Sequence, residues 1–196
     1  MHGIEVFFCF SVIKDTMKLE AQFENKSGKL FSIKTGREIR TDNLVRVDAA
    51  SIDAEALSSI EFAAEFTGCR SALLGLCLAW KTVEITPEVY NEEFLAALRD
   101  FLKNIEASDV YAVIVPETDG TACGAALEQY TAAMVHAARR IKDCESVIGF
   151  SLPPELAADG EAASSFMNAM AVKHAQYVYF SANDTGNTQL VPYHMR

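Results

Sequence analysis

Acidic side chains stand at the ends of apolar segments in the C-terminal half of this sequence. Glu117 closes the run "DVYAVIVPE", and Glu155 follows the run "SVIGFSL" after two prolines. Asp119 and Asp184 lie in polar segments that follow such runs. Carboxylates gathered at one edge of a sheet can bind a divalent cation through oxygen ligands, or they can serve only as solvated loop acids beside helix N-termini. Which of these two roles the acids have depends on how the preceding apolar segments are arranged in the fold.

Strand-like and helix-like patterns alternate along most of the chain. We expect strands at 43–50, 71–80, 109–117, 146–152 and 175–182, with one more short strand in the tail 185–196. We expect helices at 51–68, 90–107, 120–142 and 161–174, the first capped by Ser51 and the second by Asn91. Such alternation predicts a parallel sheet with right-handed crossovers. Glu117 and Glu155 then end neighbouring strands, which lie about 4.8 Å apart in a sheet.

The N-terminal part follows a different pattern. Residues 18–41 contain two-residue alternation interrupted by "NKSG" and "KTGR", which predicts a β-meander. The apolar run 4–13 is expected to be a strand or a packed arm, because it is too short to span a bilayer. We therefore divide the chain into an arm and meander at 1–43 and one (β/α)-repeat unit at 44–196. A closed eight-stranded barrel takes about 250 residues, so a partial barrel is expected, with an open flavodoxin-like sheet as the alternative.

Composition excludes several kinds of partner. The 196 residues carry a net charge of −10, which argues against nucleic acid and against an anionic membrane surface. The five cysteines include no C-x-x-C pair, so we expect buried free thiols in a reducing, cytoplasmic setting. No histidine has a partner at metal-binding spacing, and no nucleotide fingerprint is present, so neither a metal nor a cofactor is expected.

With the elements in place, the sequence resembles a known family. The segments "LFSIKTGREIRTDNLVRVDAA", "TGCRSALLGLCLAWKTVEITPEVYNEEFLAALRDFLKNIEASDVYAVIVPE" and "CESVIGFSLPPEL" are similar to the N-terminal hairpin and the first four barrel strands of cellulase-like glycoside hydrolases. These enzymes are (β/α)8 barrels of the retaining clan. The likeness covers roughly residues 29 to 181.

The resemblance implies roles for individual residues. Glu155 corresponds to the general acid/base glutamate of the family, which would protonate the leaving glycosidic oxygen. Trp80 corresponds to an aromatic platform for a sugar ring. The family's asparagine before the acid is Pro154 here, a supporting arginine is Gly75, and the strand that carries the nucleophile is missing. Glu117 is the candidate replacement for that second carboxylate, with Asp119 and Asp184 as further ligand contacts.

Three functions follow from these observations. The first is a glycoside hydrolase-like protein that acts on a β-linked sugar through Glu155. The second is a non-catalytic protein that binds a carbohydrate or a protein partner, and the third is an unrelated α/β domain that binds a small molecule. A partial barrel also leaves strand edges open, and open edges promote pairing. We therefore expect either a homo-oligomer that closes the gap or coverage of the edges by the meander and the arm.

Overall fold

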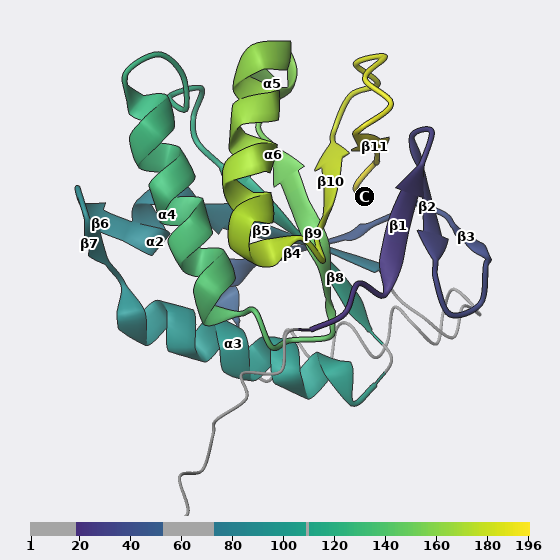
Figure 1. Ribbon diagram of the computed structural model, residues 1–196. Coiled ribbons are helices and arrows are strands. Elements are labelled where there is room, and N and C mark those ends of the chain that lie inside the picture. The colour runs from purple at the N-terminus through teal and green to yellow at the C-terminus, as the bar shows by residue number, and fades with distance from the viewer. Residues whose placement is uncertain (1–18, 53–72, 109) are drawn as a thin grey trace, which may run out of the picture.

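The central feature of the fold is a six-stranded parallel sheet (Figure 1). The computed structural model describes residues 19–52, 73–108 and 110–196. The strands are β4 (Val45–Asp48), β5 (Leu73–Ala79), β8 (Tyr111–Glu117), β9 (Val147–Leu152), β10 (Val178–Ser181) and β11 (Val191–Pro192). They lie side by side in chain order, and every neighbouring pair is parallel. A doubly wound sheet reverses its strand order at a switch point, so this order confirms the partial-barrel prediction and excludes the flavodoxin-like alternative.

Helices cover one face of this sheet (Figure 1). The long ones are α3 (Glu92–Glu106), α4 (Ala126–Arg140) and α6 (Gly160–His174), and the single turns are η1 (Ala49–Ser51), α2 (Trp80–Val83) and α5 (Pro154–Ala157). The predicted cap of α3 is confirmed, because Asn91 Oδ1 accepts a hydrogen bond from the Phe94 N–H at 3.1 Å. Ser51 was predicted to cap a helix, but it is the last residue of η1, and Asp48 caps that turn. Most of the helix predicted after Ser51 lies outside the described residues.

A three-stranded antiparallel meander precedes the sheet, as predicted. Its strands are β1 (Phe23–Lys26), β2 (Lys29–Ser32) and β3 (Glu38–Ile39). Ser27 and Gly28 both have positive φ, which is the turn geometry that matches the twist of a two-residue hairpin. The division of the chain at residue 43 stays a prediction. A second small ribbon, β6 (Glu84–Thr86) paired with β7 (Val89–Tyr90), lies in a segment for which no strand was predicted.

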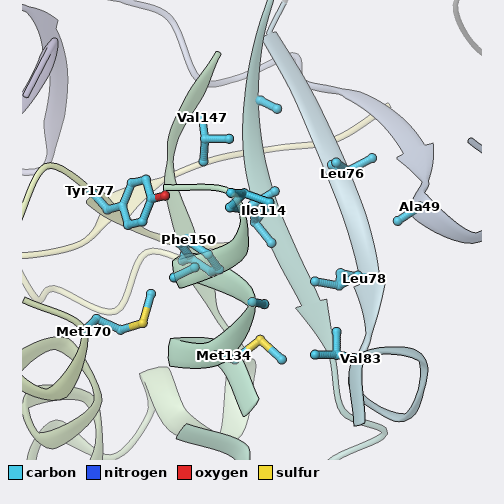
Figure 2. Packing of buried hydrophobic residues seen from close by; sticks show 14 of the residues in the cluster. Ala49, Leu76, Leu78, Val83, Ile114, Met134, Val147, Phe150, Met170 and Tyr177 are labelled. Atoms are coloured by element: carbon cyan, nitrogen blue, oxygen red, sulfur yellow. The ribbon is translucent and has the colours of Figure 1, made fainter. Parts of the chain in front are cut away.

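Alternation along the strands separates two apolar layers. On the helical face, Leu76, Leu78 and Ile114 of the strands belong to one buried cluster with Met134 and Met170 of the helices (Figure 2). On the opposite face, here called the inner face, apolar side chains from several strands meet residues of the meander and the tail. Successive strand residues point to opposite faces, so one chain segment supplies both layers.

The C-terminal tail connects the two edges of the sheet. After β11, the Leu44 N–H donates to the His194 carbonyl at 2.8 Å, and the Arg196 N–H donates to the Leu44 carbonyl at 3.1 Å. Leu44 and Met195 thereby form a parallel bridge next to β4. The Met195 side chain lies over Gly75, where an added Cβ would come within 2.4 Å of its Sδ atom. The tail thus supplies the edge strand β11 beside β10 and continues to a bridge next to β4, a connection that the sequence analysis did not predict.

This tail weakens the argument for association. The homo-oligomer was expected because open strand edges seek partners. In the described residues, however, the C-terminal segment pairs with β10 and forms a bridge with Leu44, the residue just before β4. The oligomeric state itself stays a prediction. Among the described helices, none is long and apolar enough to cross a membrane.

Candidate functional site

A pocket opens at the carboxyl ends of β5 and β8. Its volume is about 330 Å³. It brings together three of the five residues that the sequence analysis selected, Trp80, Glu117 and Asp119. The wall is completed by residues of α2, the β6–β7 ribbon, the loop after β8 and α4: Lys81, Glu84, Ile85, Thr86, Pro87, Thr118, Thr121 and Gln129, with Ala79 from the end of β5. Carboxyl ends of parallel strands are where barrel proteins place their sites. We call this cavity the rim pocket.

Trp80 is held in place by a buried carboxylate. Its Nε1–H donates to Glu84 Oε2 at 2.9 Å, and the Gln129 amide donates to the same oxygen at 3.0 Å. The Glu88 backbone N–H donates to the other oxygen, Oε1, at 2.8 Å. The indole ring also packs edge-on against Tyr130, with the ring centroids 5.5 Å apart. Three donors satisfy Glu84, which is only 6% exposed, and the network fixes the plane of the indole.

Glu117 is paired with an arginine that the sequence analysis missed. The Arg46 guanidinium donates from Nη2 to Glu117 Oε1 at 2.5 Å, and both side chains are about half exposed. Arg46 lies on β4 and Glu117 on β8, so the pair crosses over β5, which lies between them. Beneath it, burial raises the pKa of the Cys77 thiol to about 11. The bond between the guanidinium and the carboxylate fixes the orientation of the Glu117 side chain.

Glu155 makes a different set of contacts. Its Oε1 accepts hydrogen bonds from the Thr118 hydroxyl and from the Ala122 N–H, the latter at 3.3 Å. Glu155 therefore ties α5 to the loop between β8 and α4. Its charge also contributes to a raised pKa at Tyr130, whose first cause is burial of that ring. Glu155 is not among the residues that line the rim pocket, although its partner Thr118 is.

The two remaining candidates are exposed loop acids. Asp119 lies 3.9 Å from Lys81, and both side chains are more than four-fifths exposed. Asp184 accepts a hydrogen bond at 3.0 Å from the Gly186 N–H of its own loop and does not line the rim pocket. Within the described residues, no group of three or more His, Cys, Asp or Glu side chains is placed to hold a metal ion. The alternative of a divalent-cation site at this edge therefore finds no ligand set there.

Comparison with solved structures identifies the fold. An exo-β-1,4-mannosidase from Opitutaceae bacterium strain TAV5 superimposes with a TM-score of 0.61 and 13% identity over 83% of this chain. Endo-glycoceramidase II from Rhodococcus sp. does so with a TM-score of 0.57 and 12% identity over 74%. The Pseudomonas stutzeri endoglucanase Cel5A superimposes with a TM-score of 0.53 and 15% identity over 70% of this chain. The fold is that of cellulase-like glycoside hydrolases.

The likeness covers only part of those enzymes. The matched regions span 36%, 49% and 50% of the three chains, respectively. At these identities the comparison establishes a shared fold and does not extend to activity. No family model matches the sequence, and a comparison with curated proteins finds no match. The chain therefore shares part of the barrel fold of these enzymes, and its site has to be interpreted from its own residues.

Proposed function

We propose that this protein binds a β-linked carbohydrate in the rim pocket, with one sugar ring lying against Trp80. The observation that carries the proposal is the fixed indole, which lines a pocket together with polar side chains. Sugar rings present apolar C–H faces and a periphery of hydroxyl groups, so a rigid aromatic ring with polar groups around it suits them. The neighbours in fold support the ligand class, because endo-glycoceramidase II has been solved with cellobiose-like compounds.

Binding without hydrolysis agrees better with the carboxylates of the site. Hydrolysis needs two carboxyl groups on opposite sides of the bond, about 5–5.5 Å apart for retention and about 6.5–9.5 Å apart for inversion. Here Glu117 is engaged by Arg46, and Glu155 is engaged by Thr118 and Ala122 at the neighbouring loop. Neither carboxylate is arranged as a free partner of the other. We therefore propose a glycoside hydrolase-like binding protein, with hydrolysis through Glu155 as the competing function.

Two measurements on the same preparation separate these functions. Calorimetric titration with β-1,4-linked gluco- and manno-oligosaccharides should give saturable binding that Trp80→Ala abolishes and Glu155→Gln retains. Incubation with aryl β-glucosides and β-mannosides should release no phenol above the buffer rate. Turnover that Glu155→Gln abolishes would establish the hydrolase instead. If none of these sugars binds, the proposed function is wrong.

A further inference from the structure

The polar surface of the rim pocket continues beyond Trp80 onto the inner face of the sheet. Glu117 belongs to both regions, since it lines the pocket and also binds Arg46. Neighbouring strands are about 4.8 Å apart, so β4 lies roughly 10 Å from β8. The Arg46–Glu117 pair therefore extends the polar surface across two strand spacings, away from the indole.

A second polar contact on the inner face lies near enough to this pair to be affected by its charges. Ser151 Oγ donates to the Tyr193 hydroxyl at 3.1 Å, and both residues are buried. Ser151 comes from β9 and Tyr193 from the tail. The charges of Arg46 and Glu117 act on Tyr193, whose pKa is raised chiefly by burial. Side chains from four separate segments of the chain therefore converge on one place at the carboxyl end of the inner face.

Arg46 and Glu117 together have the donors and acceptors that a sugar needs. The bond between them uses Nη2 of Arg46, whereas a guanidinium carries five N–H donors and a carboxylate accepts several bonds. A sugar hydroxyl both donates and accepts, so adjacent hydroxyls can bond to the guanidinium and to the carboxylate together. Both side chains are about half exposed, which leaves them accessible to a ligand.

We infer that the Arg46–Glu117 pair is a second sugar-binding position, so that the ligand of the rim pocket is an oligosaccharide of two or more units. This inference rests on the proposed function. One ring occupies the pocket against Trp80, and the next unit places its hydroxyls on Arg46 and Glu117. A single sugar ring gains only the first set of contacts and binds more weakly.

The experiment compares ligand length in two variants and a control. Calorimetry is run with methyl β-glucoside, cellobiose and cellotriose, and with methyl β-mannoside and the matching mannose oligomers. For the unmodified protein, the disaccharide of the preferred series should bind at least about tenfold tighter than the methyl glycoside, which corresponds to one charge-assisted hydrogen bond. Arg46→Gln, which changes a residue outside the rim pocket, should remove most of that gain and leave the affinity for the methyl glycoside unchanged within about twofold. Glu117→Gln should weaken the binding of both ligands, because Glu117 also lines the rim pocket.

The control is Arg139→Gln. Arg139 is an exposed arginine in the last turn of α4, at the opposite end of that helix from the rim pocket, so its replacement should change no affinity. Half-exposed ion pairs contribute little to stability, so both variants of the pair should unfold near the temperature of the parent protein. Equal affinities for methyl glycoside and oligosaccharide would overturn the inference, as would an equal loss for all lengths in Arg46→Gln. If no sugar binds at all, the proposed function itself fails.

Discussion

Replacing Glu84 by alanine should loosen Trp80 and lower the stability of the whole protein. The carboxylate is 6% exposed and accepts from three donors, which belong to Trp80, Gln129 and the Glu88 backbone. Hydrogen bonds to a charged group contribute about 1.5–3 kcal/mol each. Their sum overstates the effect, because alanine also removes the cost of burying a carboxylate, which is several kcal/mol. The three donors are partly accessible to water, and we expect a net loss of about 2–3 kcal/mol in the free energy of unfolding.

This loss converts to a measurable shift in the unfolding temperature. For a domain of this size, 1 kcal/mol corresponds to about 2–4 °C, so Glu84→Ala should unfold about 4–12 °C lower than the parent. Trp80 is the sole tryptophan, so its fluorescence reports on this position alone. Loss of the Nε1 partner and wider access of water should shift the emission to longer wavelength.

Two further variants make the experiment decisive. Glu84→Gln keeps the shape but presents an NH2 group either to the Glu88 N–H or to the donors of Trp80 and Gln129, so it should also be destabilised. Glu88→Gln is the matched control, because only the backbone of Glu88 bonds to Glu84. An unfolding temperature within about 1 °C of the parent and an unchanged emission spectrum for Glu84→Ala would refute the claim that this carboxylate positions the indole.

Three other outcomes follow from the packing and burial of single residues. Gly75→Ala should cost about 1–3 kcal/mol in chemical denaturation, because the new Cβ overlaps the Met195 side chain, and Met195→Ala should restore part of the loss in the double variant. In a variant whose cysteines outside the described residues are serine, only Cys123 should react quickly with a thiol reagent. The buried thiols of Cys77 and Cys144, whose pKa values burial raises to about 11 and about 12, should react only when the protein unfolds. Rapid reaction of all three thiols would contradict this. Burial lowers the pKa of His174 below its usual 6.5, so the unfolded state takes up more protons; stability should fall as the pH drops below about 6.5. His174→Asn should flatten that dependence, and an unchanged slope would refute the assignment.

The sheet could be predicted because the sequence patterns that indicate it are local and repeated. Continuous apolar runs, a capping asparagine at Asn91 and the alternation of elements all describe short segments, and parallel pairing then brings the strand ends to one edge. That is why the acids at the strand ends, among them Glu117 and Asp119, could be expected at one edge of the sheet, whereas the role of Trp80 was implied by the family resemblance. A short strand was also expected in the tail 185–196, where β11 lies.

The contacts that define the site could not be predicted in this way. The Arg46–Glu117 pair spans a strand that lies between its members, so it depends on the register of three strands. Glu84 sits in a three-residue strand that is too short to show a periodicity. Pro154 occupies the first position of α5 and starts a helical turn, which directs Glu155 to the Thr118 loop. Resemblance to a family supplied the position of that glutamate but not its orientation.

The central claim is that the pocket beside Trp80 holds a sugar ring. Because Trp80 is the sole tryptophan, a fluorescence titration with β-linked oligosaccharides measures the claim directly. We expect a saturable change in emission with cellotriose or its mannose counterpart, and no change with the same concentration of glycerol or sorbitol. An emission spectrum that stays constant through millimolar concentrations of every sugar, in a protein that remains folded, would contradict it.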